Sequence, residues 1–142
     1  MLYFDTSFLV PLFLQEATSA RIERVMAGLA GQDLATSHWT RVEFSSLLAR
    51  EVRMGGLDSK TAREVDAEFE GVAQQSFVVL VPSVDDFDLA KQYIDRHQSG
   101  LRAGDALHLA IAQNHSSTQI YSLDNTLLRA GRQLGLPMTR GI

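Results

Sequence analysis

Short apolar runs alternate along the chain with longer segments in which apolar residues recur every three or four positions. The runs predict strands at Leu2–Phe4, Leu34–Ser37, Phe77–Val81, Gln119–Ser122 and Leu136–Thr139. The first of these has no polar alternation, which is typical of a strand that is covered on both faces of a parallel sheet.

The segments with helical spacing predict seven helices. They are expected at Ser7–Gln15, at Thr18–Leu29, at Trp39–Met54, from Ser59 to about Ala73, from Ser83 to about Gln98, at Ala103–His115 and at Asn125–Gln133. Ser7 and Ser83 are expected to cap their helices, and Pro11 predicts a kink or an early end of the first one. The run Ala106–Ala112 is apolar almost all round, so its helix should be buried against the sheet.

Strands that alternate with helices imply crossover connections and a parallel sheet. No linker, internal repeat or low-complexity segment interrupts the pattern. We therefore expect one α/β domain over residues 1–142, with helices layered on both faces of a central parallel sheet.

Composition narrows the class of protein. Hydrophobic residues make up 45% and charged residues 21% of the 142 positions, which is ordinary for a globular chain. The sequence contains no cysteine, which fits a cytoplasmic location, and no apolar run that approaches the roughly 20 residues needed to span a bilayer. The formal net charge of −4 argues against a protein that simply coats nucleic acid. That argument weakens if some of the acids are held by cations.

Four acids stand where predicted elements begin or end: Asp5, Glu43, Asp105 and Asp124. Local structure could explain each of them separately. Asp5 could cap the helix that follows it, and Glu43 could complete a capping box with Thr40. Asp105 could be the N-cap of the buried helix, and Asp124 could belong to a turn.

Together the four acids indicate a cation site. In a parallel sheet the carboxyl ends of the strands and the amino ends of the following helices share one edge, where open α/β sheets bind ligands. Asp5 and Asp124 would reach this edge from strands, and Glu43 and Asp105 from the first turns of helices. Converging carboxylates repel one another, and a Mg²⁺ or Mn²⁺ ion, which prefers carboxylate and water oxygens, would relieve the repulsion. Such a site suits phosphodiester hydrolysis, because the ion makes water more acidic and stabilises charge on the phosphate.

These residues resemble a PIN-domain ribonuclease, and most closely the VapC-type toxins of bacterial and archaeal toxin–antitoxin pairs. The resemblance spans nearly the whole chain and is carried by Tyr3–Ser7, Arg41–Phe44, Arg102–Ala110 and Ser122–Asp124. The Asp-Thr-Ser opening is weak by itself, whereas the Arg-Ala-Gly-Asp-Ala-Leu-His-Leu-Ala segment and the joint spacing are far more specific. Ser122 stands where relatives often have Thr, a change that keeps the hydroxyl.

The resemblance implies a three-layer α/β/α PIN fold and a Mg²⁺- or Mn²⁺-dependent endoribonuclease acting on RNA, with tRNA or rRNA as the typical target. It implies that the four acids bind the metal and that Thr6 or Ser7 orients water or the phosphate. It also implies a homodimer and a VapB-type antitoxin whose tail fills the groove and blocks the acids.

Two other classes of function stay open. Asp5 could be the nucleophile of an aspartyl-phosphate phosphotransferase, although Ser7 stands where a haloacid-dehalogenase-like enzyme has its second Asp. The chain could also be a binding module that keeps the fold without catalysis.

Basic and aromatic residues near the same edge are candidates for RNA contacts. Arg41, Arg50, Arg53 and Arg102 could hold phosphates, with simple solvation as the alternative. Trp39 could stack a base, with a core or interface role as the alternative.

The remaining ionisable residues are not expected to contribute to the site. His38, His97, His108 and His115 lack metal-motif spacing, so no histidine is expected to be a ligand. The stretch from Glu64 to Asp95 contains eight acids and one Lys, so RNA should avoid the face that this stretch covers.

Overall fold

The computed structural model describes residues 1–142 and contains a five-stranded sheet in the order β3-β2-β1-β4-β5. The strands are β1 (Leu2–Phe4), β2 (Leu34–Ser37), β3 (Val78–Leu80), β4 (Gln119–Tyr121) and β5 (Met138–Thr139). Every neighbouring pair is parallel, which confirms the predicted α/β class with a central parallel sheet.

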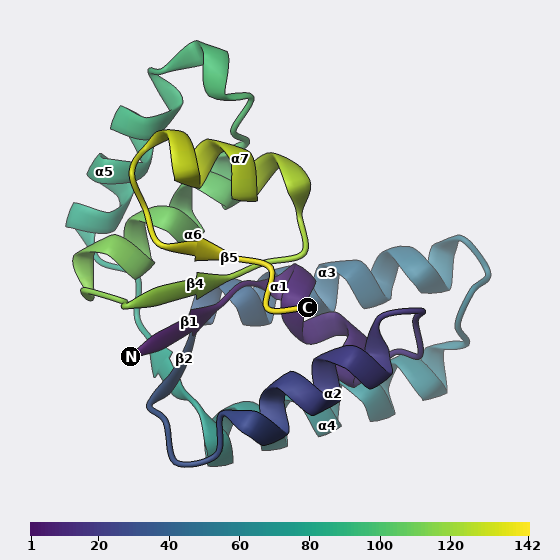
Figure 1. The fold of residues 1–142 in the computed structure, drawn as a ribbon. Coiled ribbons are helices and arrows are strands. Elements are labelled where there is room, and N and C mark those ends of the chain that lie inside the picture. The colour runs from purple at the N-terminus through teal and green to yellow at the C-terminus, as the bar shows by residue number, and fades with distance from the viewer.

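Seven α-helices and two short 3₁₀ turns connect the strands. They are α1 (Thr6–Leu9), η1 (Val10–Leu12), α2 (Ser19–Gly28), α3 (His38–Arg53), α4 (Ser59–Ser76), α5 (Val84–Ile94), η2 (His97–Ser99), α6 (Ala103–Asn114) and α7 (Asn125–Gln133). Figure 1 shows α1 to α4 gathered on one side of the sheet and α5 to α7 on the other. This arrangement is the predicted three-layer α/β/α fold. None of the helices is both long and apolar enough to cross a membrane.

The apolar run of β1 is explained by two hydrophobic cores, one on each face of the sheet. Tyr3 points into the core beneath α5, α6 and α7, and Phe4 points into the core beneath α1 to α4. Ile120 and Tyr121 divide between the same two cores in β4. Because successive side chains of a strand face opposite sides, a strand covered on both faces needs apolar residues at every position.

The first helix differs from the prediction. It ends at Leu9 and does not continue to Gln15, and the chain passes into η1, which contains Pro11; the early end that Pro11 predicted is confirmed. Asp5, not Ser7, is its N-cap, because the Asp5 side chain accepts a hydrogen bond from the backbone N–H of Phe8 at 2.9 Å. Ser7 lies inside the first turn, which leaves its hydroxyl free to bond elsewhere.

The other elements agree with the prediction except at their ends. The fifth helix stops at Ile94 and not at Gln98, and the segment beyond it forms η2. Gly100 follows η2 with a φ of 71°, a left-handed conformation that glycine adopts without steric cost. The last strand is limited to Met138 and Thr139.

The strand order creates a crevice beside β1. The chain builds outward from β1 through β2 to β3, and then returns to the opposite side of β1 to add β4 and β5. The order therefore reverses between β1 and β4, which is where open α/β sheets bind ligands beyond the carboxyl ends of their strands. Asp5 follows β1 and Asp124 lies just beyond β4, so both acids border this crevice.

Candidate active site

A cavity of about 660 Å³ lies at the reversal point of the sheet. All six residues expected to bind the metal or to orient water or the phosphate line it: Asp5, Thr6, Ser7, Glu43, Asp105 and Asp124. They come from the ends of β1 and β4 and from α1, α3 and α6. The fold thus brings together acids that are far apart in the sequence.

Asp5 is held by a set of donors at the base of the cavity. Its side chain is 3% exposed. The Ser122 hydroxyl donates to Oδ2 at 2.6 Å, and the Ser7 hydroxyl lies 2.8 Å from Oδ1. Burial raises the pKa of Asp5, while His108 and these donors oppose the rise. These donors orient the carboxylate, and no Lys, Arg or His forms a salt bridge with it.

Glu43 is held by a different set of side chains. It stands in the second turn of α3, because the helix begins at His38 with Ser37 as its N-cap. The predicted capping box with Thr40 is therefore wrong. The Thr6 hydroxyl donates to Glu43 Oε2, and His108 Nε2 lies 2.6 Å from the same oxygen.

His108 is a residue of this cavity that the sequence did not single out. Its side chain is 2% exposed. Nε2 of the ring contacts Glu43, and Nδ1 contacts the Tyr3 hydroxyl. Burial opposes the charged form of both partners, but their mutual contact prevails, so the pKa of Glu43 is lowered and that of His108 is raised. The only sequence signal was its position, one helical turn after Asp105 on a helix that is otherwise apolar.

Asp105 and Asp124 both line the cavity, and they are close enough for their charges to interact. Burial, and then the negative charge of Asp124, raise the pKa of Asp105. Asp105 is not the N-cap of α6, since Arg102 occupies that position without a side-chain cap bond. Asp124 does cap α7, where it accepts from the backbone N–H of Leu127 at 2.9 Å. Capping therefore explains Asp124 in part, and Asp105, in the first turn of α6, bonds the backbone of the N-cap residue Arg102, which opposes the rise of its pKa.

Three of the four candidate arginines line the cavity, namely Arg50, Arg53 and Arg102, and none of them forms a salt bridge. Arg41 is instead paired with Glu70 at 2.8 Å. Trp39 also lines the cavity, with a buried indole N–H that has no hydrogen-bond partner. The cavity thus has an acidic centre and a partly basic, aromatic border.

The donor chemistry of the cavity suits a hard divalent cation, because four carboxylates border one space and burial raises the pKa of both Asp5 and Asp105. As the side chains stand, no three His, Asp or Glu residues are grouped closely enough to hold an ion. Asp5 and Glu43 are directed toward Ser122, Ser7, Thr6 and His108 instead.

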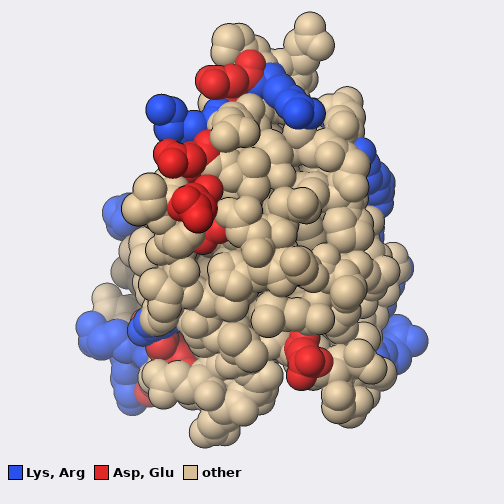
Figure 2. Space-filling model, turned by 90° about the vertical axis from the view of Figure 1, so that its left-hand side faces the viewer, with Lys and Arg blue, Asp and Glu red and all other residues tan.

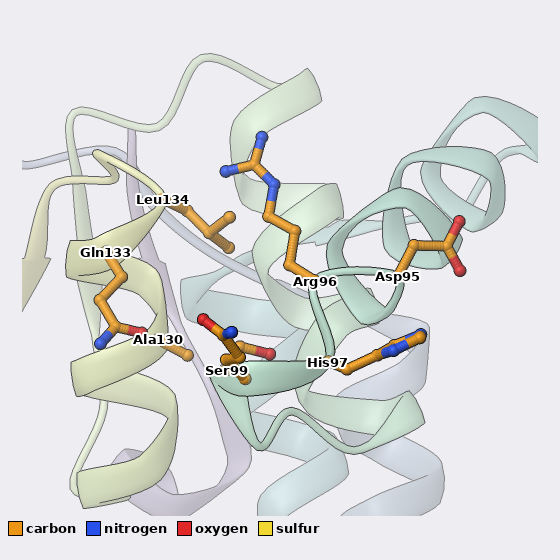
Figure 3. A pocket seen from close by; sticks show the side chains of 8 residues that line it. Asp95, Arg96, His97, Ser99, Ala130, Gln133 and Leu134 are labelled. Atoms are coloured by element: carbon orange, nitrogen blue, oxygen red, sulfur yellow. The ribbon is translucent and has the colours of Figure 1, made fainter.

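A second cavity, of about 600 Å³, lies between η2 and α7 (Figure 3). Arg96, Ser99 and Gln133 are among its lining residues. In Figure 3 the Asp95 carboxylate and the His97 ring point away from Gln133 and Leu134. This cavity has no cluster of acids and is not the candidate active site.

Charge is unevenly spread over the surface. Figure 2 shows a face that is largely free of charged side chains, with acidic side chains gathered toward its upper left. The candidate cavity carries both signs of charge, because Arg50, Arg53 and Arg102 line it together with its acids.

The comparisons with known proteins agree with this geometry. The family model of the PIN domain matches residues 2–133. The solved VapC20 of Mycobacterium tuberculosis, a toxin described as cleaving the sarcin–ricin loop, is similar with a TM-score of 0.69 and 22% identity, over 92% of this chain and 95% of that chain. Comparison with curated protein sequences gave no match.

Two further solved structures share the fold. VapBC2 from Rickettsia felis, bound to a DNA fragment from its promoter, is similar with a TM-score of 0.73 and 14% identity, over 98% of both chains. FitAcB from Neisseria gonorrhoeae is similar with a TM-score of 0.69 and 16% identity, over 99% of this chain and 98% of that chain. At such identities these likenesses establish a common fold.

Proposed function

This chain belongs to the PIN-domain family, and we propose that it is a Mg²⁺- or Mn²⁺-dependent endoribonuclease that serves as the toxin of a toxin–antitoxin pair. The observation that carries the proposal is the convergence of Asp5, Glu43, Asp105 and Asp124 on one cavity. Membership of the family supports nuclease chemistry. The similar toxin described as cleaving the sarcin–ricin loop supports RNA as the substrate class.

The four acids would hold the cation, with Asp5 as the buried ligand, Glu43 and Asp105 half-buried and Asp124 exposed. A divalent cation, when bound, supplies positive charge against the phosphate and makes water a stronger acid. Ser7 and Ser122 orient the Asp5 carboxylate, and Thr6 orients Glu43. Because these hydrogen bonds already hold the two carboxylates, less side-chain freedom would be lost when the cation binds.

Hydrolysis needs water to add to phosphorus while the bond from phosphorus to a ribose oxygen breaks. Arg50, Arg53 and Arg102 border the cavity without acidic partners, so they are available to hold the phosphates on either side of the scissile bond. Trp39 offers an aromatic surface at the same border, against which an unpaired base could stack. A single-stranded segment of a structured RNA, such as tRNA or rRNA, fits such a border.

The partners follow from the same assignment. The similar solved structures include VapBC and FitAB complexes bound to DNA, which supports a cognate antitoxin of the VapB type for this chain. We also propose a homodimer located in the cytoplasm, where RNA and antitoxin would be encountered.

One observation favours a second candidate, a PIN-fold binding module without catalysis. No three potential ligands are grouped to hold an ion before one binds. Such a module would bind RNA equally well with and without a divalent ion. The aspartyl-phosphate alternative is less favoured, because the Asp5 carboxylate is buried and already bonded by Ser7, Ser122 and the N–H of Phe8.

Cleavage of RNA by the purified protein tests the proposal. Cutting should require Mg²⁺ or Mn²⁺ and stop in chelator. Asp5→Ala should lower the rate roughly a thousandfold, because a metal ligand contributes several kcal/mol to the transition state. Asp88→Ala, which removes an exposed acid of α5, is the matched control. Wild-type cleavage by Asp5→Ala would refute the assignment, and phosphate label on the protein would favour the aspartyl-phosphate alternative.

Expression in a bacterial host tests the toxin role. The wild-type chain should arrest growth, and Asp105→Asn at an equal protein level should relieve the arrest. Arrest that persists in the variant would indicate toxicity by binding instead of cleavage.

A further inference from the structure

His108 connects the three elements that carry the buried part of the site. Its Nδ1 lies 2.8 Å from the Tyr3 hydroxyl on β1, and its Nε2 lies 2.6 Å from Glu43 Oε2 on α3. His108 itself belongs to α6, one helical turn after Asp105. One buried ring therefore bridges β1, which leads into Asp5, and the two helices that carry Glu43 and Asp105.

The direction of the hydrogen bonds follows from the number of protons available. The Tyr3 hydroxyl donates its single proton to Ser37 Oγ at 3.0 Å, so His108 Nδ1–H donates to the Tyr3 oxygen. On the other side, the Glu43 carboxylate accepts from Nε2–H. Because Ser37 is the N-cap of α3, the chain of bonds also reaches the start of the helix that carries Glu43.

Glu43 has little freedom to leave this contact. Thr6 donates to the same oxygen that His108 holds. The other oxygen, Oε1, lies against Gly104, where an added Cβ would be only 2.7 Å away, and Trp39 closes the same side. The two oxygens are thus distinguished: Oε2 is engaged by His108 and Thr6, whereas Oε1 lies beside Gly104 and the Trp39 indole, which adds to the lowering of the Glu43 pKa.

We propose that His108 is a positioning residue, which holds Glu43 through Oε2 and so sets the place of this carboxylate relative to Asp5 and Asp105 for binding of the divalent ion. This inference rests on the proposed function. Tyr3 fixes the orientation of the His108 ring through Nδ1, and Ser37 holds the Tyr3 hydroxyl. The donor on Nε2 is the group that matters for Glu43.

Two substitutions of His108 separate the ring's two nitrogens. The amide nitrogen of Gln reaches approximately the place of Nε2, and that of Asn approximately the place of Nδ1. Gln thus keeps a donor for Glu43 and Asn keeps one for Tyr3, while both remove the charge of the ring, so any effect of charge cancels in the comparison.

Calorimetric titration with Mn²⁺ and steady-state RNA cleavage are both measured on the full chain. We expect the Gln variant to bind Mn²⁺ about fivefold more tightly than the Asn variant, because one hydrogen bond to a charged group is kept. We expect kcat at saturating Mn²⁺ to be about tenfold higher for Gln than for Asn, with KM for RNA equal within about twofold. A merely structural role would make both variants lose activity in step with their melting temperatures.

Equal Mn²⁺ affinity and equal kcat for the two variants would overturn the proposal. His115→Gln and His115→Asn, near the end of the same helix, are the matched controls and should not differ from each other. If the Asn variant does not fold, Tyr3→Phe carries the test. It should lower kcat about threefold by freeing the ring, whereas Tyr93→Phe, which removes a hydroxyl with no partner in the site, should not.

The outcomes also separate this inference from the proposed function. A wild-type chain that binds Mn²⁺ without cutting RNA would refute the ribonuclease and leave the Mn²⁺ comparison of Gln and Asn intact. A wild-type chain that binds no Mn²⁺ would overturn both. Wild-type cleavage with indistinguishable Gln and Asn variants would overturn the positioning role alone.

Discussion

The Ser122 hydroxyl donates a 2.6 Å hydrogen bond to Oδ2 of Asp5 across 117 positions of the sequence. This bond joins the end of β4 to the end of β1, on the two sides of the point where the strand order reverses. Ser7 adds a second link, because its hydroxyl reaches Asp5 and its oxygen accepts from the backbone N–H of Leu123 at 2.9 Å. The buried carboxylate is therefore oriented by two hydroxyls from separate parts of the chain.

Removal of the Ser122 hydroxyl should impair cleavage. We expect Ser122→Ala to lower kcat about tenfold, because Asp5 loses one hydrogen bond to its charged form. Ser122→Thr keeps the hydroxyl and should retain most of the activity. The measurement compares the cleavage rates of wild type, Ser122→Ala and Ser122→Thr at equal Mg²⁺ concentration. Equal losses of activity in the two variants would show that the volume of the side chain matters and not its hydroxyl.

The role of Asp105 can be separated from helix stability by metal linkage. Asn suits the first turn of a helix as a neutral replacement, so Asp105→Asn should be at least as stable as wild type in chelator, where one repelling carboxylate is gone. With Mg²⁺ at about a hundred times its dissociation constant, wild type should gain about 2.7 kcal/mol and the variant much less. Thermal melts of both proteins, with and without Mg²⁺, test this, and equal shifts would remove Asp105 from the site.

The raised pKa of Asp105 predicts a pH dependence of stability in the absence of metal. Folded Asp105 keeps its proton to higher pH than the unfolded chain does, so the free energy of unfolding should fall as pH rises above the ordinary value of 3.8. Asp105→Asn abolishes this contribution. Urea unfolding in chelator should therefore show the variant's advantage growing as pH rises above about 3.8 and levelling off once the folded Asp105 is ionised. A constant difference across this range would contradict the raised pKa.

The backbone of α6 lies close to Glu43 at Gly104. A Cβ there would lie 2.7 Å from Glu43 Oε1 and 3.1 Å from Trp39 Cζ2, so Gly104→Ala should push the carboxylate aside and lower cleavage about tenfold. Stability should stay equal or rise by up to about 1 kcal/mol, because Ala favours a helix over Gly.

Gly71→Ala in α4 is the matched control, since nothing lies within 4 Å of its added Cβ. It should leave cleavage unchanged. Full activity in Gly104→Ala, measured beside this control, would show that Glu43 tolerates displacement.

Arg102 should contribute to RNA affinity and not to the chemical step. It is exposed at the border of the cavity and has no acidic partner. Arg102→Gln should therefore raise KM several-fold and leave kcat unchanged. It should also reduce by about one the slope of log affinity for RNA against log salt concentration. Arg21→Gln on α2 is the control. An unchanged salt slope would place the RNA backbone elsewhere.

Much of the fold was accessible from local pattern. The apolar run at Tyr3 and Phe4 predicted a strand covered on both faces, and the structure confirms it with one core on each side. The apolar stretch of α6 predicted a buried helix, and residues Ala106–Ala112 are all buried. The resemblance to the PIN domain is confirmed by the family match. These features depend on the spacing and type of residues that are neighbours in the sequence, so they can be predicted from short segments.

Helix caps were less predictable, because several polar residues near a helix start compete for the same role. Thr40 and Glu43 have the spacing of a capping box, but Ser37 is the cap and Glu43 turns toward Thr6 and His108. Ser7 and Asp5 were both candidates to cap the first helix, and Asp5 takes that position. Which residue becomes the cap depends on where the strand before it ends, and the strand's end depends on its neighbours in the sheet.

The sequence by itself determined the order of the elements, the parallel sheet and the four acids, because those follow from hydrophobic period and from residue types at element ends. Only the tertiary structure decided how the acids are held. His108 and Glu43 are 65 positions apart, and their contact exists because α3 and α6 both begin at the edge where β1 ends. No local pattern distinguishes a histidine that packs in a core from one that holds a carboxylate, since the difference lies in what a distant helix places beside it.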